Sequence, residues 1–288
     1  MEKTIKYVVK AEKKLIDVLR EDLEFSSRIV RTLKRQKKVV VNNIPISFNA
    51  RLRVGDTIVV YLPEEENIFN PEDMSIEVVY EDDHFIVINK QAFKVVHPTK
   101  GHPFGTIANG VAGYMISKGE SYKIRFANRL DRDTSGALII CKSGLGQKII
   151  SDQMQSQTIL KEYDAIVHGV VELDEGTIDE PIGRAYEDSV HRVVRPDGSP
   201  SLTHYKVIKR MADKTWLRIQ LKTGRTHQIR VHLKHLGHII VGDELYGSTH
   251  DLINRQALHA CHLGFNNIRG EAIDLWVGMP EDMKKIVE

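Results

Sequence analysis

A short acidic segment divides this chain of 288 residues into two parts of unequal size and charge. Residues 63–74, PEEENIFNPEDM, are bounded by Pro63 and Pro71 and lack hydrophobic periodicity, which is typical of a linker. Hydrophobic residues make up 41% of the sequence, so a chain of this length can bury a substantial core. We therefore expect a small domain over residues 1–62, a linker over 63–75 and a larger domain over 76–288.

Positive charge is concentrated in the smaller part. Residues 1–62 contain 14 Lys or Arg against 7 Asp or Glu, whereas the remainder contains 27 basic and 32 acidic residues. A basic surface favours polyanions, because neutralising phosphates releases condensed counterions. Nucleic acid is therefore the expected partner. An anionic membrane surface is the alternative, but no aromatic-rich amphipathic helix accompanies the charge.

Several features bound the class of protein. No apolar run approaches the roughly 20 residues needed to span a bilayer, and the N-terminus lacks the apolar segment of a secretory signal. The two cysteines, Cys141 and Cys261, form neither a disulfide framework nor a CxxC metal pair. These features predict a cytoplasmic protein without a membrane partner, and we expect it to act as a monomer.

The basic part contains two short helical patterns. Apolar residues recur at helical spacing over residues 12–23, and Ser26 is a suitable N-cap for a second helix. The expected RNA-binding side chains on this second segment are Arg28, Arg31, Lys34, Arg35 and Lys38. Four of them, at i, i+3, i+7 and i+10, share one helix face, with Lys34 the exception. The alternative is a solvated basic helix with no partner.

Two β-prone runs about an Asn42-Asn43 turn follow, and then a strand after Gly55-Asp56. This order of helix, basic helix, hairpin and strand resembles the small S-four-like RNA-binding module named after a ribosomal protein. The resemblance covers roughly residues 13–62.

The larger part has more strands than helices. Strands are expected within 75–90, 137–143, 164–170, 203–208 and 216–222, and helices near 106–118, 144–157 and 226–236. Strict βαβ alternation is missing, so we expect an α+β domain on a mixed, largely antiparallel sheet.

Three polar segments are candidates for chemistry. NRLDRDTSGALII, at 128–140, presents Asp131 and Asp133 beside Arg129 and Arg132, although such aspartates often only cap backbone amides. KEYDAIVHG, at 161–169, places Tyr163 on a strand, where most tyrosines have a packing role.

LKTGRTHQIRVHLKHLGH, at 221–238, is the third segment and places Arg225 at a glycine turn before a helix. An anion or a carboxylate could lie at this helix N-terminus. The alternative is a surface arginine.

Together the three segments resemble the RluA-type RNA pseudouridine synthases. The shared motifs are RLD-x-x-TSG from Arg129, K-x-Y from Lys161, TGR-x-HQIR from Thr223, an INK…VHP stretch from Ile88 to Pro98, VGDELYG at 241–247 and RQALHA at 255–260. The resemblance covers about 76–288, and the S-four-like module is a frequent N-terminal partner in that family. Asn128, Gln91 and Asn266-Asn267 depart from common family residues and leave the RNA target in doubt.

The resemblance implies the conversion of uridine to pseudouridine in structured RNA, with no cofactor and no metal. It implies that Asp131 is the catalytic carboxylate, either as nucleophile or beside a glycal-like intermediate, and that Arg225 forms its ion-pair partner. Tyr163 would stack on the target base or serve in proton transfer at the sugar. The base itself must be flipped into the pocket. Arg129 would fill the vacated space or hold the backbone, and Ile229 would form an apolar wall. Ribosomal RNA, with the large subunit favoured, and tRNA are both possible substrates.

Three other functions are less consistent with the sequence. Seven of the 13 histidines lie between His227 and His262, but they form no HExxH zinc motif, and His227 and His232 fall on different helix faces. A non-catalytic RNA-binding protein with a degenerate synthase domain would be expected to lose Asp131, which is present. A tRNA-synthetase-like enzyme would need a nucleotide-binding signature, and none is found.

Overall fold

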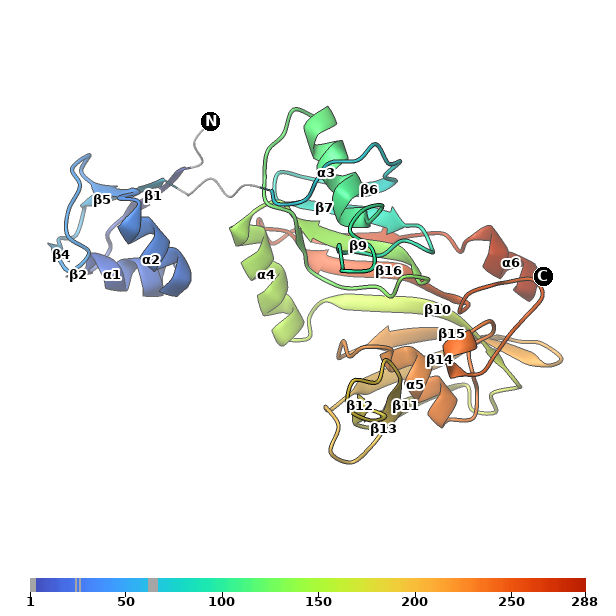
Figure 1. Cartoon of the computed structure of the whole chain (residues 1–288). Helices are drawn as coiled ribbons and strands as arrows, with labels where there is room; N and C mark the ends of the chain where they lie inside the picture. Colours follow the sequence, from blue (N-terminus) through green and yellow to red (C-terminus); the bar gives the residue numbers. More distant parts are fainter. Residues whose placement is uncertain (1–3, 24, 26, 62–66) are drawn as a thin grey trace. The chain divides into compact units, whose positions relative to one another are not determined.

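The structure, a computed structural model, describes residues 4–23, 25, 27–61 and 67–288, apart from the Arg28 side chain. The chain forms two compact units, Met1–Glu66 and Asn67–Glu288 (Figure 1). The unit boundary therefore falls between Glu66 and Asn67, inside the segment expected to be the linker.

The first unit packs two short helical segments on a small sheet. Its three-stranded sheet has the order β1-β5-β3, with both pairs antiparallel. Its elements are β1 (Thr4–Val8), β2 (Lys13–Lys14), α1 (Leu15–Asp17), η1 (Val18–Asp22), α2 (Ser27–Arg35), β3 (Val39–Val41), β4 (Arg51–Leu52) and β5 (Thr57–Tyr61). Leu15, Leu19, Leu33, Ile58 and Val60 are fully buried in its core. The helical spacing in the sequence thus places one apolar face of each helix against the sheet.

Backbone geometry explains two turns of the first unit and corrects one expectation. Asn42 and Asn43 both have positive φ, as a tight hairpin turn requires, and Asn residues tolerate this region well. Lys37 also has positive φ, which ends α2 at Arg35. Lys38 therefore lies beyond the helix and is half-buried, so it does not extend the cationic face as predicted. The predicted N-cap, Ser26, lies outside the described residues.

The second unit is built on one ten-stranded sheet. Eight strands follow the order β11-β14-β15-β10-β16-β9-β7-β6, with β17 paired to β16 and β8 paired to β9. The strands are β6 (Val78–Glu81), β7 (Phe85–Lys90), β8 (Arg125–Phe126), β9 (Ser135–Cys141), β10 (Leu160–His168), β11 (Glu175–Asp179), β14 (Leu202–Arg210), β15 (Lys214–Leu221), β16 (Leu258–Asn266) and β17 (Ala272–Trp276). Only β16 and β9 pair in parallel within this sheet. This architecture confirms the predicted α+β class with a mixed, largely antiparallel sheet.

Helices and one small hairpin complete this unit (Figure 1). They are α3 (Ile107–Ser117), α4 (Gly144–Gln155), α5 (Gln228–His235), η2 (Glu244–Tyr246), α6 (Glu281–Val287) and the hairpin β12 (Ile182–Arg184) and β13 (Arg192–Val194). Side chains of α3, α4 and α5 enter the main core with the central strands. The predicted helices near 106–118, 144–157 and 226–236 correspond to these three.

Residues 67–74 belong to the second unit and contact α3. The Glu72 backbone N–H donates to the Asn109 carbonyl oxygen at 3.1 Å, and the Glu72 carboxylate accepts from the Gly105 N–H at 2.9 Å. A Cβ at Gly113 would lie 2.1 Å from the Glu72 carbonyl oxygen, so only glycine permits this contact. The acidic composition predicted a linker here, whereas hydrogen bonds fix the segment to a helix.

The sheet register brings the candidate segments together. Tyr163 on β10 pairs with Ile219 on β15 and with Ala260 on β16, and a β-bulge interrupts the β10–β16 ladder between Glu162 and Tyr163. Bulges bend a strand and change the direction of nearby side chains. The backbones of β9 and β16 also lie close together, because a Cβ at Gly136 would lie 2.2 Å from the Ala260 carbonyl oxygen.

Candidate active site

A cavity of about 380 Å³ opens in the second unit, and all three predicted motifs line it. Asp131 and Arg129 come from the loop before β9, Tyr163 from β10, and Arg225 and Ile229 from the turn and helix after β15. Such a volume is typical of small-molecule sites and accommodates a single nucleotide. The structure thus brings together residues that are up to 100 positions apart in the sequence.

Asp131 lies in a tight turn that three buried side chains support. The Thr134 N–H donates to the Asp131 carbonyl oxygen at 3.2 Å, and the Gln256 side chain donates to the Thr134 hydroxyl at 3.1 Å. Arg255 donates to the Asp133 carbonyl oxygen at 3.2 Å and forms an ion pair with Asp282 of α6.

Lys90, at the end of β7, is the third support and is fully buried. Its ammonium group donates to the carbonyl oxygens of Gln91, Arg132 and Thr134 at 2.8–2.9 Å. Burial lowers the pKa of Lys90 to about 7, although the charges of Asp133 and Asp131 act in the opposite direction. Lys90 therefore fixes the backbone of the Asp131 loop from beneath.

Arg230 is the ion-pair partner of Asp131. Its Nη1 donates to Asp131 Oδ2 at 3.1 Å, while its Nε and Nη2 bind the two oxygens of Asp243 at 2.7 Å each. Asp243 is 1% exposed and Arg230 is 7% exposed. Burial acts to lower the pKa of Arg230, but the hydrogen bonds and charges of Asp243 and Asp131 outweigh it and raise that pKa above its usual value. One guanidinium is thus fixed by a buried carboxylate and faces a second carboxylate in the cavity.

The predicted pairing of Arg225 with Asp131 is wrong. The Arg225 side chain is exposed, and its Nε donates to the Pro200 carbonyl oxygen at 3.2 Å. Its backbone N–H donates to the Gln228 side chain at 2.9 Å, and the same Gln228 oxygen accepts from the Thr223 hydroxyl. Gln228 therefore fixes the glycine turn with Arg225 directed along the rim, and the first turn of α5 brings Arg230 to Asp131 instead.

His227 joins this network in a left-handed backbone conformation, with φ of 57°. Its Nδ1 lies 3.0 Å from the Tyr246 hydroxyl, and its Nε2 lies 3.8 Å from Asp131 Oδ2. Burial lowers the pKa of His227 below its usual value, and the Asp131 charge opposes this only in part. The ring is therefore mainly neutral at pH 7 and does not form a second charged partner for Asp131. Tyr246 also lies under the Arg230 guanidinium, whose carbon is 5.0 Å from the ring centre.

Tyr163 is 6% exposed and lines the cavity. Burial raises the pKa of its hydroxyl well above the usual value, and the charge of Asp131 raises it further. The hydroxyl therefore stays protonated throughout the physiological range. Ile229 is buried and Arg129 is exposed, and both residues line the cavity.

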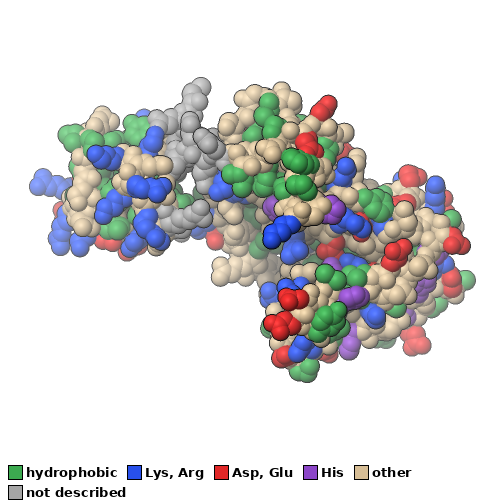
Figure 2. Space-filling view, viewed as in Figure 1, with side chains coloured by type: hydrophobic (Ala, Val, Ile, Leu, Met, Phe, Trp, Pro, Cys, Tyr) green, Lys and Arg blue, Asp and Glu red, His purple; other side chains and the backbone are tan. Residues whose placement is uncertain are grey.

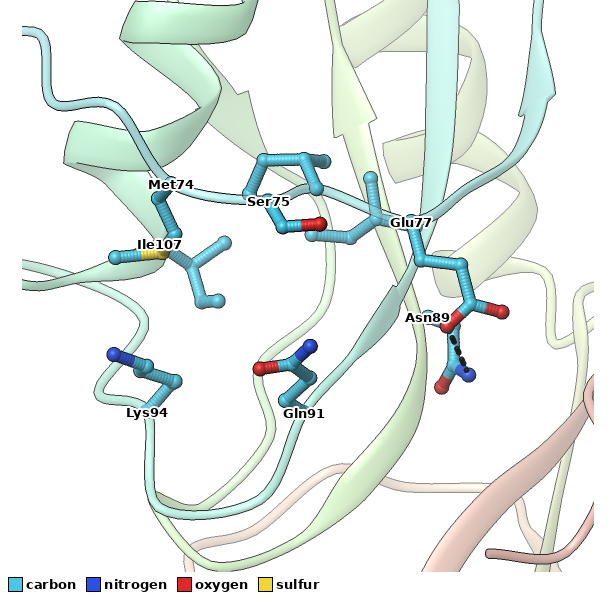
Figure 3. A pocket seen from close by; sticks show the side chains of 9 residues that line it. Met74, Ser75, Glu77, Asn89, Gln91, Lys94 and Ile107 are labelled. Atoms are coloured by element: carbon cyan, nitrogen blue, oxygen red, sulfur yellow. Dashed lines mark hydrogen bonds between the residues drawn. The ribbon is translucent and has the colours of Figure 1, made fainter.

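A second depression, at the edge of β7, is too small for a ligand. Met74, Ser75, Glu77, Asn89, Gln91, Lys94 and Ile107 surround it, and Asn89 donates to Glu77 at 3.0 Å (Figure 3). Its volume of about 10 Å³ is at the lower limit for one water molecule.

His232 of α5 has a structural role. His232 is buried, with Nδ1 2.9 Å from the Thr203 hydroxyl and Nε2 2.9 Å from the Glu180 carbonyl oxygen. Within the described ranges, no group of three or more His, Cys, Asp or Glu side chains is arranged to hold a metal ion. Among the same residues, no helix is long and apolar enough to cross a membrane.

Comparison with known proteins gives a consistent result. Residues 84–235 match the family described as RNA pseudouridylate synthase. The chain is 38% identical over 251 residues to an uncharacterized RNA pseudouridine synthase, YjbO, of Bacillus subtilis, covering 86% of this chain and 89% of that protein. It is 37% identical over 240 residues to ribosomal large subunit pseudouridine synthase D of Escherichia coli K12, covering 78% of this chain and 73% of that protein. The solved structure of human RNA pseudouridylate synthase domain containing 1 matches with a TM-score of 0.59 and 25% identity, covering 73% of this chain and 86% of that one.

Sequence reasoning missed the roles of Arg230, Asp243, His227 and Lys90. All four lie in segments that the sequence had already singled out: HQIR, VGDELYG and INK. The motifs thus marked the correct segments. The assignment of Arg225 rather than Arg230 failed because the direction of a side chain at a turn depends on Gln228, which is a tertiary contact.

Proposed function

Because this chain belongs to the RNA pseudouridylate synthase family, we propose that the 380 Å³ cavity is its active site and that it isomerises uridines in large-subunit ribosomal RNA. The enzyme class, an isomerase acting on RNA, is the one predicted from the sequence. The observation that carries the assignment of the site is the Asp131 carboxylate in the cavity, 3.1 Å from the buried Arg230.

The reaction breaks the bond between C1′ and N1 of uridine, turns the base and joins C5 to C1′. An anionic oxygen beside C1′ is needed, either to attack that carbon or to remove the 2′ proton. Asp131 meets this need, because its turn is fixed by Lys90, Arg255 and Gln256 and its oxygen is oriented by Arg230. A reacting group held in one position lowers the entropic part of the barrier.

Tyr163 and Ile229 would hold the flipped base between an aromatic ring and an aliphatic wall. A uridine inside a stacked RNA cannot reach the cavity, so the nucleotide must rotate out of the stack. Arg129, exposed at the rim, is suited to the place left by the base or to a neighbouring phosphate. These roles follow from positions around one cavity together with the family's reaction.

The ribosomal target is favoured by the relatives. Several of them carry the name ribosomal large subunit pseudouridine synthase D, at 36–38% identity. Transfer RNA is the second candidate and is an outcome of the test below.

We also assign RNA binding to the first unit, as an S-four-like module. Its helix α2 carries Arg31, Lys34 and Arg35, and the last two are exposed near the C-terminal end of the helix. Lys and Arg side chains cover much of the visible face of this unit in Figure 2. The order of helical segments, turn and strand agrees with the module that the sequence resembles. The Arg28 side chain, also predicted to take part, lies outside the described part of the chain.

The test is to map pseudouridines in RNA from cells with the wild-type gene, without it, and with Asp131→Asn. Loss of modification at discrete large-subunit positions in the second and third strains would support the proposal. Loss confined to tRNA would overturn the target, and unchanged modification in the Asp131→Asn strain would overturn the site. The near-isosteric amide removes the anionic oxygen while keeping the size of the side chain.

A further inference from the structure

Lys161 is a cation in the cavity that the roles above leave unused. It lies two residues before Tyr163 on β10, so both side chains point to the same face of the sheet, and both line the cavity. Lys161 is half-buried, and across the described residues its ammonium group has no hydrogen-bond or ion-pair partner. Burial lowers its pKa below the usual value, with no compensating carboxylate. A desolvated cation without a partner is costly to keep, so a ligand that supplies one would gain from binding there.

The positions along the cavity indicate which part of a nucleotide reaches Lys161. Asp131, Tyr163 and Lys161 line the same cavity, and Lys161 lies two positions from Tyr163 along β10. With C1′ of the substrate at Asp131 and the base on Tyr163, a carbonyl oxygen of the base would lie within reach of Lys161. Same-face residues two apart on a strand are about 6.6 Å apart, a distance that a lysine side chain spans.

We propose that the Lys161 ammonium group binds a carbonyl oxygen of the flipped uracil and stabilises the uracil anion that forms when the glycosidic bond breaks. This inference rests on the proposed active site around Asp131. When the C1′–N1 bond breaks, its electron pair passes to the base, and the negative charge spreads onto O2 and O4. Asp131 either bonds to C1′ and is displaced as a carboxylate when C5 attacks that carbon, or takes the proton from C2′ and later returns it. C5 then bonds to C1′ and loses its proton, while N1 gains one, so the product is an isomer of the substrate.

A phosphate is the less suitable ligand for Lys161. Arg129 and Arg225 are exposed at the rim, where the RNA backbone passes, whereas Lys161 is half-buried on the strand that carries Tyr163. Lysine acts as a point charge, so it can follow an oxygen as the base turns. A donor placed where charge develops contributes to the rate more than to binding.

The test compares Lys161→Met with Lys161→Arg and with Lys206→Met, an exposed lysine on β14. The substrate is a transcript of bacterial large-subunit ribosomal RNA with tritium at C5 of uridine, and a second transcript carries 5-fluorouridine. Tritium release is followed under single-turnover conditions, and consumption of 5-fluorouridine is followed by mass spectrometry of nuclease digests. RNA affinity at several salt concentrations and the melting temperature are measured for each variant.

Lys161→Met should lower the single-turnover rate on uridine RNA by about 10²-fold, with unchanged RNA affinity and melting temperature. The loss should be clearly smaller on 5-fluorouridine RNA, because fluorine already stabilises the departing anion. Lys161→Arg should retain part of the rate, and Lys206→Met all of it.

An unchanged rate for Lys161→Met, or an equal loss on both substrates, would overturn the proposal. Weaker RNA binding by Lys161→Met, with the slope of log affinity against log salt concentration reduced by about 0.7–0.9, would also overturn it, because that change identifies Lys161 as a phosphate contact. Asp131→Asn on the same transcripts distinguishes failure of the proposed active site from failure of the proposed role of Lys161. If Asp131→Asn remains active, the proposed active site is wrong, independently of the result for Lys161.

Discussion

Replacing Arg230 with Met should damage both stability and catalysis, whereas the same replacement at Arg225 should do neither. The two arginines are five positions apart in one motif, but Arg230 is 7% exposed and binds two carboxylates, and Arg225 is exposed with one side-chain hydrogen bond. They therefore form a matched pair in which the substitution is constant and only the environment differs.

The size of the effect follows from Asp243. Without Arg230, the Asp243 carboxylate is 1% exposed and loses two charge-assisted hydrogen bonds of 2.7 Å, which leaves an unpaired charge in the interior. Removing one partner of a buried pair costs about 3–5 kcal/mol. For a unit of this size, each kcal/mol lowers the melting temperature by about 2–4 °C, so a loss of roughly 6–20 °C is expected. Arg225→Met should change stability by less than about 1 kcal/mol.

Urea unfolding and thermal melts of both variants measure these values, and tritium release from C5 of uridine measures turnover. Adding Asp243→Asn to Arg230→Met should recover about 1–3 kcal/mol, because it removes the unpaired charge. Turnover should remain low in the double variant, since Asp131 still lacks its partner. If Arg230→Met melts and turns over like the wild type, the assignment of this ion pair is wrong.

Three further predictions follow from the site and the first unit. The pKa of Lys90 is about 7 in the folded protein and about 10.5 in the unfolded chain, so the free energy of unfolding should rise by about 2 kcal/mol between pH 7 and pH 9. Urea unfolding of Lys90→Met should show no such rise. Tyr163→Phe should leave the basic limb of the pH–rate profile unchanged up to about pH 10, because the raised pKa of Tyr163 keeps its hydroxyl protonated there. A shift of the basic limb in this variant would show that ionisation of Tyr163 causes it. Deleting residues 1–66 should weaken RNA binding and flatten the dependence of log affinity on log salt concentration by about 0.7–0.9 per lost phosphate contact, while turnover on saturating short RNA persists. The combined substitutions Arg31→Ala, Lys34→Ala and Arg35→Ala should reproduce much of this loss. If the salt dependence is unchanged, this unit does not bind RNA.

The sequence predicted the second unit well where local pattern and fold agree. Alternating or continuous apolar runs identified β7, β9, β10, β14 and β15, and helical stretches of sequence identified α3, α4 and α5. Thr106 and Ser143 cap two of these helices through their side chains, a signal that is local in sequence. β11, with the sequence EGTID, carries little apolar signal and was not predicted. β17, with the sequence AIDLW, was not predicted either, although most of its residues are apolar.

The candidate site could be predicted as a set of segments but not as a set of contacts. Asp131, Tyr163, Ile229 and Arg129 line one cavity, in agreement with the prediction that these segments meet at one site. The partner of Asp131 is 99 positions away and was chosen wrongly, because spacing within a motif does not determine which arginine turns inward. Lys90, an ordinary strand residue by its pattern, acquires its role only through the loop folded over it.

The support of the Asp131 turn has a consequence for how the enzyme becomes active. Thr134 of this turn contacts Lys90, 44 positions away, and Gln256, 122 positions away. Arg255, which also supports the turn, pairs with Asp282 of α6, 27 positions away. Long-range contacts form late in folding, because the loops between them must close first. The carboxylate therefore reaches its working position only after Lys90 of β7 and Gln256 have closed on its turn. A nascent chain that ends before Arg255 would contain Asp131, Tyr163 and Arg230 and yet be a poor catalyst, because two of the three side chains that support the Asp131 turn would be missing.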